Sequence, residues 1–172
     1  MDDDIRIQPV SFAELDPLVR MYDQFEPLGA ALSLPPYDAD VRRGWIEFAL
    51  AHRLNLGAFS RDGRSIGHSF LVTDEAHSAE LAIFVHQDFR RRGIGTSLLQ
   101  AMLSWGERAG LRRIWTLTAS DNRAALRLQM KCGFRVKDPA SPEIVMEIDL
   151  PRARPAPALQ LERATLVAGL RR

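Results

Sequence analysis

Residues 90–96, with the sequence Arg-Arg-Arg-Gly-Ile-Gly-Thr, separate two apolar stretches that differ in periodicity. Residues 80–85 before them (Glu-Leu-Ala-Ile-Phe-Val) are apolar and β-branched enough for a buried strand. Residues 97–105 after them (Ser-Leu-Leu-Gln-Ala-Met-Leu-Ser-Trp) carry apolar side chains at helical spacing. The sequence therefore predicts a strand that enters a glycine-containing turn and continues directly into a helix.

This turn is predicted to bind a phosphate group. The N-terminus of a helix presents unpaired backbone N–H groups and the positive end of the helix dipole. Gly93 and Gly95 have no Cβ, so a bulky anion can approach the main chain there. The spacing does not match the P-loop of nucleotide hydrolases. It also fails the dinucleotide-binding fingerprint, whose third glycine would fall at Leu98.

The turn resembles the acyl-CoA loop of the GNAT superfamily of N-acetyltransferases, which reads Arg-x-x-Gly-x-Gly between a strand and a helix. A second match strengthens the resemblance. Residues 122–134 (Asn-Arg-Ala-Ala-Leu-Arg-Leu-Gln-Met-Lys-Cys-Gly-Phe) are similar to the family's other signature, Asn-x-x-Ala-x-x-Leu-Tyr-x-Lys-x-Gly-Phe. They follow a candidate strand at 114–118. The resemblance spans residues 5–150 and is clearest over residues 80–134.

Strand and helix patterns alternate along residues 1–150, which we expect to form one domain of the α/β (α+β) class. The expected order is β-α-α-β-β-β-α-β-α-β-β, which the resemblance also implies. It corresponds to a central, mixed but mostly antiparallel twisted sheet of about seven strands with helices on both faces. Ser11 and Glu14 form a capping box before the first helix. The inward positions of the first two helices are predicted to include Phe12, Val41, Trp45, Phe48 and Ala49.

The composition is that of an ordinary globular protein. The chain has 172 residues, a hydrophobic content of 46% and a net charge of +1, which opposes binding to polyanions. No apolar run approaches the ~20 residues of a membrane span. An acidic N-terminus and a single cysteine, Cys132, indicate a cytoplasmic protein without disulfides. Residues 151–172 are expected to form a proline-rich tail, with a short helix possible at 161–170.

The resemblance implies acetyl-CoA as the cosubstrate and no metal. Pantetheine would lie like an extra strand between the strand ending at Val85 and the strand ending near Ala119. Main-chain groups of Phe84 and Val85 would bond its amides, and the Val85 N–H would polarise the thioester carbonyl. Asn122 would bond the pantetheine arm, cap its own helix, or do both. The phosphates and adenosine would be held by residues of the loop and helix start, namely Arg90, Arg91, Arg92, Gly93, Ile94, Gly95, Thr96 and Ser97.

An amine acceptor arrives protonated at neutral pH, so a proton acceptor is needed. Glu80, at the head of the strand before the loop, matches the position where some family members carry a general base. His68, on the preceding strand, is the alternative base, because a histidine has a suitable intrinsic pKa. The loop at 27–37 and the turn at 74–78 would border the acceptor cleft. Asp38, Asp74 and Glu75 there favour a cationic amine.

Gln129 is the one departure from the family signature, which has tyrosine at this position. That tyrosine often protonates the leaving sulfur, and an amide cannot. A thiol with a pKa near ~8.5 leaves as thiolate without much help, so activity can survive the change. The general acid is therefore unassigned.

The sequence favours an N-acetyltransferase that moves an acetyl group from acetyl-CoA to a primary amine of a small molecule or a peptide, by direct attack in a ternary complex. The alternative is a CoA-binding relative without turnover, serving as a sensor or an interaction domain. A nucleic-acid-binding module is opposed by the near-zero net charge and the lack of interleaved aromatic residues. The acceptor, the acyl-chain preference and a homodimeric state are left open.

Overall fold

The computed structural model describes residues 5–29, 34–52, 54–74, 76–138 and 143–151. These residues form a seven-stranded sheet with the strand order β1-β2-β3-β4-β5-β7-β6. The strands are β1 (Arg6–Pro9), β2 (Leu54–Phe59), β3 (Ser65–Thr73), β4 (Ser78–Val85), β5 (Arg113–Ala119), β6 (Arg135–Asp138) and β7 (Glu143–Asp149). The helices are α1 (Leu15–Asp23), α2 (Ala39–His52), α3 (Ile94–Arg108) and α4 (Arg123–Lys131), with short 3-10 turns η1 (Phe12–Glu14) and η2 (Gln87–Phe89).

The expected fold class and element order are confirmed. Every neighbouring pair of strands is antiparallel except β4 and β5, which run parallel. The parallel pair follows from the chain path, because the crossover through α3 returns β5 to the same direction as β4. The expected tail at 151–172 lies outside the described residues, apart from Pro151.

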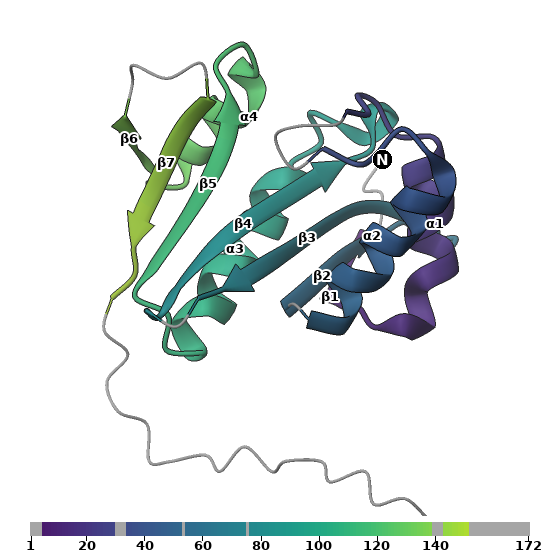
Figure 1. Ribbon diagram of the computed structural model, residues 1–172, viewed down its shortest axis with the longest axis horizontal. Coiled ribbons are helices and arrows are strands. Elements are labelled where there is room, and N and C mark those ends of the chain that lie inside the picture. Colours follow the sequence, from purple (N-terminus) through teal and green to yellow (C-terminus); the bar gives the residue numbers. More distant parts are fainter. Residues whose placement is uncertain (1–4, 30–33, 53, 75, 139–142, 152–172) are drawn as a thin grey trace, which may run out of the picture.

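Two hydrophobic cores lie on opposite faces of the sheet. One packs α3 against β3, β4 and β5 through residues such as Leu71, Leu98 and Ile114. The other packs α1 and α2 against β3 and β4 through Tyr22, Ile46 and Phe84. Figure 1 shows α1 and α2 in front of the sheet and α3 behind it. Side chains of one strand alternate between the two cores, as the pleat requires.

The buried faces of the first two helices differ from the prediction. The capping box at Ser11 is present, but it opens η1 rather than α1, and Phe12 on this separate turn is 53% exposed. On α2, Val41 and Phe48 are exposed, whereas Arg42 is buried. Arg42 occupies the core-facing stripe because its guanidinium is neutralised by Asp23 at 2.6 Å.

Candidate active site

The strands β4 and β5 are paired over only a short part of their length. Their register runs from Ser78 opposite Arg113 to Glu80 opposite Trp115. Beyond this vertex, residues 81–85 of β4 pair only with β3, and residues 116–119 of β5 pair only with β7. Figure 1 shows the two strands diverging toward their arrowheads. We call this divergence between residues 81–85 and 116–119 the splay.

The main chain of β4 points alternately toward β3 and toward the splay. The His86 N–H donates to the Ile66 carbonyl at 3.0 Å, and the Ser78 carbonyl accepts from the Asp74 N–H at 2.9 Å. Because antiparallel pairs alternate along a ladder, the even-numbered residues of β4 bond to β3. The odd-numbered residues Ile83 and Val85 therefore direct their main-chain groups toward β5, which does not pair with them.

Phe84 does not fit the role expected for it. Its main chain pairs with His68 of β3, and its side chain is only 6% exposed. The ring packs 5.7 Å from that of Phe25, in the core under α1 and α2. Neither part of Phe84 faces the splay. Ile83, which was not among the predicted site residues, directs its main chain toward the splay instead.

The N-terminus of α3 lies directly beyond the end of β4. Gly93 is the N-cap residue, with φ of 84° in the left-handed region, and α3 has no side-chain cap and no acidic residue in its first turn. The first intrahelical bond runs from the Ser97 N–H to the Gly93 carbonyl at 3.0 Å. The N–H groups of residues 94–96 precede this bond and are available to an anion. The Ser97 N–H is already bonded to the Gly93 carbonyl, so only the Ser97 hydroxyl could bind an anion.

The two glycines of this turn have different surroundings. A Cβ at Gly93 would meet no described atom within 4 Å, so the space over this residue is open. A Cβ at Gly95 would lie 3.1 Å from the Leu128 side chain of α4 and 3.6 Å from Val85. Gly95 therefore lets Leu128, in the second half of α4, pack closely against the start of α3 beside Val85.

The three arginines of the turn point in different directions. The Arg90 guanidinium donates to the Val85 carbonyl at 2.9 Å and to the Glu26 carbonyl, and it lies 5.5 Å from the Phe25 ring. Burial lowers the pKa of Arg90, while the Glu26 carboxylate opposes that shift. Arg92 stacks on Phe89 at 5.1 Å. Arg91 is exposed, with φ of 62°. Arg90 thus faces the segment after α1, which the sequence pattern did not indicate.

Asn122 precedes α4 as its N-cap residue, and Gln129 lies within its last turn. The Asn122 side chain accepts from the Ala125 N–H at 3.1 Å, so it caps α4, and its amide nitrogen is the group left for a ligand. Gln129 is only 2% exposed. Its amide nitrogen lies 2.9 Å from the Thr118 hydroxyl and 3.4 Å from the Thr116 hydroxyl of β5. Gln129 is therefore a buried hydrogen-bonding residue that ties α4 to one strand of the splay.

Glu80 lies at the vertex of the splay. It is the last residue of β4 that pairs with β5, directly opposite Trp115, and it pairs with Val72 on its other side. Directly opposite residues share a face of the sheet, so Glu80 projects on the α1–α2 side together with Ala82 and Phe84. It is partly exposed. A carboxylate is thus placed where the two strands separate.

His68 lies in the core rather than at the surface. It is fully buried, its Nδ1 lies 2.8 Å from the Tyr22 hydroxyl, and its Nε2 lies 3.0 Å from the Asn55 side-chain oxygen. The Asn55 amide nitrogen donates to the Ala49 carbonyl, so its oxygen accepts from Nε2–H and Nδ1 accepts from Tyr22. Burial lowers the pKa of His68 to about 3. With both nitrogens engaged, His68 is unsuited to be the alternative base.

The buried His68 predicts a pH-dependent stability. Between pH 3 and 6.5 the unfolded chain binds a proton at His68 that the folded protein does not, because burial lowers the folded pKa to about 3. The free energy of unfolding should therefore fall as pH drops below 6.5, by up to about 1.4 kcal/mol per pH unit from this residue. Urea unfolding at several pH values should show a shallower loss for His68→Gln. Equal slopes in both proteins would contradict the assignment.

The two aspartates expected to attract an amine have local structural roles. The Asp38 carboxylate accepts from the Val41 N–H at 2.9 Å, at the start of α2. The Asp74 carboxylate accepts from the N–H groups of Ala76 and Ser78, both at 2.9 Å. The Ser78 hydroxyl bond and these contacts hold the pKa of Asp74 below its ordinary value. Glu75 lies outside the described residues. Both described carboxylates thus have local partners, and their role toward a cationic acceptor stays a prediction.

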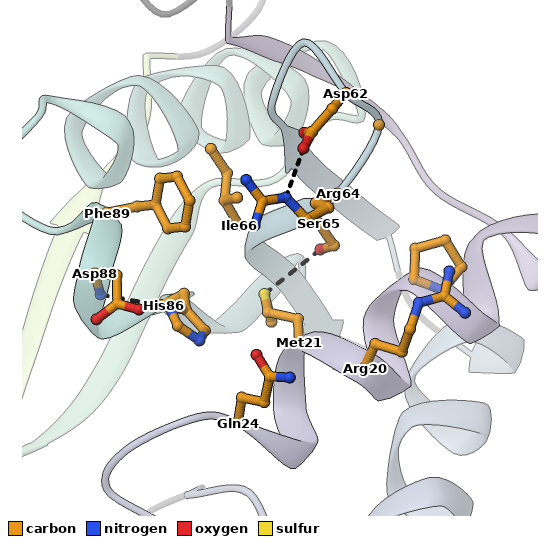
Figure 2. Close-up of a pocket in the computed structure, with 12 residues that line it drawn as sticks. Arg20, Met21, Gln24, Asp62, Arg64, Ser65, Ile66, His86, Asp88 and Phe89 are labelled. Carbon is orange, nitrogen blue, oxygen red and sulfur yellow. Dashed lines mark hydrogen bonds and ion pairs between the residues drawn. The ribbon is translucent and has the colours of Figure 1, made fainter.

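A cavity of about 330 Å³ is lined by residues of α1, the β2–β3 turn, the start of β3 and η2, and by none of β5 or α4. Figure 2 shows it between α1, the β2–β3 turn and η2, with Arg64 bonded to Asp62 at 2.7 Å and the Ser65 hydroxyl to Met21 at 3.4 Å. The Arg64 guanidinium, which points into the cavity, is already paired with the Asp62 carboxylate. This cavity is separate from the residues expected to bind a cosubstrate.

The part of the chain that the structure describes holds no group of three or more metal-ligating side chains. Within the same residues, no helix combines the length and apolarity needed to cross a bilayer.

A sequence model of the acetyltransferase (GNAT) family matches residues 15–134. The chain belongs to the GNAT acetyltransferase family. Solved GNAT structures share its fold at low sequence identity. A GNAT-family acetyltransferase from Streptococcus pneumoniae is 18% identical, with a TM-score of 0.71 over 86% of this chain and 100% of the other. The ribosomal-protein-S18-alanine N-acetyltransferase from Escherichia coli is 18% identical, with a TM-score of 0.70 over 88% and 97%.

A third solved structure, that of an acetyltransferase from Salmonella typhimurium with its cofactor acetyl-CoA, also shares the fold of this chain. It is 20% identical, with a TM-score of 0.70 over 91% of this chain and 99% of the other. At these sequence identities, the similarity to the solved structures shows the fold alone.

Proposed function

We propose that this GNAT protein is an N-acetyltransferase that transfers the acetyl group of acetyl-CoA to a primary amine. The observation that carries the proposal is the splay, with the start of α3 at its open end and Glu80 at its vertex. An extended ligand with an anionic end and a reactive end fits this arrangement. The related Salmonella protein was solved with acetyl-CoA, which supports the same cosubstrate here.

The anionic end of the cosubstrate would bind at α3. The N–H groups of residues 94–96 would donate to the pyrophosphate, and the open space over Gly93 would admit it. Arg91 and Arg92 would attract the phosphates from the exposed side of the turn. The amide nitrogen of Asn122 would reach the pantetheine arm from the start of α4. Val85 and Ile83 would bond the pantetheine amides as a neighbouring strand does.

The thioester would lie deeper in the splay than Val85. Pantetheine separates the phosphates from the sulfur, and Val85 is the residue of β4 nearest to the phosphate turn. The arm therefore has to extend past Val85 toward the vertex. We accordingly assign the polarising N–H to Ile83 rather than to Val85, which was the expectation from the sequence. A donor aimed at the carbonyl oxygen stabilises the negative charge that develops there.

Glu80 would accept the proton from the attacking amine. The acceptor's ammonium group first gives one proton to the Glu80 carboxylate, directly or through one water. The neutral nitrogen then bonds to the thioester carbon, the carbon–sulfur bond breaks, and CoA leaves as thiolate. The second proton of the nitrogen passes to the thiolate or to solvent. A thiol with a pKa near ~8.5 leaves readily as its thiolate at neutral pH, so no general acid is required.

A thiol-release assay tests the proposal. Acetyl-CoA is incubated with small amines, aminoglycoside antibiotics, peptides with free N-termini and peptides with internal lysines. We expect release with at least one of these classes, dependent on both the acceptor and the protein. Binding of acetyl-CoA without release from any of them would favour the second candidate function, a CoA-binding domain without turnover. That candidate is supported by Gln129 in place of the family tyrosine.

Substitution of Gln129 should affect stability more than catalysis. Gln129→Ala removes a buried amide and leaves the hydroxyls of Thr116 and Thr118 without this partner, which should cost roughly 1–3 kcal/mol of unfolding free energy. The rate of the chemical step should stay within about twofold, because thiolate departs unaided. Urea unfolding and single-turnover kinetics measure the two effects. If the Gln129→Ala protein is fully folded and its rate nevertheless falls more than tenfold, Gln129 takes a direct part in catalysis.

A further inference from the structure

The segment between α1 and α2 has two described parts that a hydrogen bond joins. The Gly29 N–H donates to the Pro35 carbonyl at 3.0 Å. We call residues 24–29 and 34–37 the stem. Phe25 of the stem packs 5.7 Å from Phe84 of β4, so the stem lies over the splayed half of that strand on the α1–α2 face. Glu80 projects on this same face.

One side of the stem is fixed to the helices by a buried arginine. The Arg42 guanidinium bonds the Pro36 carbonyl at 2.7 Å and the Tyr37 carbonyl at 2.8 Å. It also pairs with Asp23 at the end of α1 at 2.6 Å, and it is 5% exposed. This anchor involves only α1, α2 and the stem, so it is independent of the cosubstrate turn.

The other side of the stem is fixed to the turn that follows β4. The Gln87 side-chain oxygen accepts from the Glu26 N–H at 3.1 Å, and its amide nitrogen donates to the Gln24 carbonyl at 2.6 Å. Arg90 adds a bond to the Glu26 carbonyl while also holding the Val85 carbonyl. Two side chains of one short turn therefore bind three main-chain groups of the stem.

This same turn leads within three residues from Arg90 to Gly93 and the start of α3. An anion bound at the start of α3 would restrict this turn, and Gln87 and Arg90 are the side chains through which the restriction would reach the stem. Ordering the stem beforehand reduces the conformational entropy lost when the acceptor binds. The turn before α3 thus connects the proposed phosphate site with the stem.

We infer that Gln87 and Arg90 are positioning residues through which the occupied cosubstrate site fixes the stem for acceptor binding. The inference rests on the proposed function, since it assumes that the stem borders the acceptor. Neither side chain has to touch the acceptor. The acceptor should therefore bind more tightly once CoA is in place.

Gln87→Ala tests this role by steady-state kinetics. The variant loses both bonds to the stem, so the KM for the acceptor should rise roughly tenfold, while the calorimetric Kd for CoA changes less than about twofold. Gln100→Ala, the same change at an exposed position of α3, should leave both constants unchanged. An unaltered acceptor KM in Gln87→Ala would overturn the inference. Absence of thiol release by the wild type would instead count against the proposed function.

Hydrogen exchange gives a second readout that does not depend on turnover. In the wild type, CoA alone should slow the exchange of peptides covering residues 24–29, since the Glu26 N–H is bonded to Gln87. Gln87→Ala should lose this slowing, and Gln100→Ala should keep it. Gln87→Glu retains an oxygen for the Glu26 N–H and loses the donor to Gln24, so its slowing should be intermediate. Full slowing in Gln87→Ala would overturn the inference.

Discussion

Glu80→Gln should lower kcat by roughly 10²–10⁴-fold at neutral pH. The substitution keeps the shape of the side chain and one acceptor oxygen, but it replaces the other oxygen with an NH2 group, so the side chain at the vertex of the splay no longer accepts a proton. The loss should shrink as pH rises toward the pKa of the acceptor amine, which is near ~10.4 for a lysine-like amine, because more of the amine is then already deprotonated. The Kd for CoA should be unchanged, since the turn at α3 binds the phosphates. Pre-steady-state rates across a pH series measure the effect.

Glu47→Gln is the matched control for this variant. Glu47 carries a carboxylate on α2 that pairs with Arg43 at 3.1 Å, away from the splay. Its substitution should leave kcat within about twofold of the wild type, as expected for a surface ion pair. A Glu80→Gln enzyme with wild-type rates near neutral pH would show that Glu80 is not the base. Because His68 is buried and neutral, the proton would then pass to solvent.

Gly93→Val should abolish detectable binding of CoA by titration calorimetry. The new side chain would occupy the open space over the α3 N-terminus, where the pyrophosphate has to approach. The substitution also strains a residue whose φ is 84°, which costs roughly 1–3 kcal/mol of folding free energy. The binding result therefore needs a control that shares the strain.

Gly110→Val provides that control. Gly110 has φ of 79°, a Cβ there would meet nothing within 4 Å, and it follows the opposite end of α3. Both variants should lose similar unfolding free energy, and only Gly93→Val should lose CoA. Gly95→Val is less informative, because its side chain would also press on Leu128 and so disturb α4. Equal CoA affinity in Gly93→Val and the wild type would contradict the proposed phosphate site.

The element order and the start of α3 were predictable because they rest on local signals. Apolar periodicity defined the strand before residue 90 and the helix after it, and Gly93 marked the junction. The buried face of α2 was not predictable in this way. Arg42 appears polar in any sequence pattern, and its burial is compensated only in the tertiary structure, by the pairing with Asp23 and the bonds to the Pro36 and Tyr37 carbonyls. Val41 and Phe48 were therefore assigned inward when they point to solvent.

The residues of the site were predicted less completely than its location. The motif indicated the β4–α3 turn, but it could not determine which residues of β4 turn their main chain toward the splay. That depends on the register with β3, which makes Ile83 rather than Phe84 available. The direction of Arg90 likewise depends on the segment after α1, 64 residues earlier in the sequence. His68 resembled a base in the sequence. Its burial and its bonds to Tyr22 and Asn55 arise only in the tertiary structure, so no sequence pattern indicated them.

A crystal structure of the protein with CoA tests the central claim most directly. The account predicts pyrophosphate oxygens at about 3 Å from amide nitrogens of residues 94–96. It also predicts pantetheine running through the splay, bonded to the main chain of Ile83 and Val85, with the sulfur on the vertex side of Val85. CoA bound elsewhere, for example at the cavity between α1 and η2, with the splay unoccupied, would contradict the account.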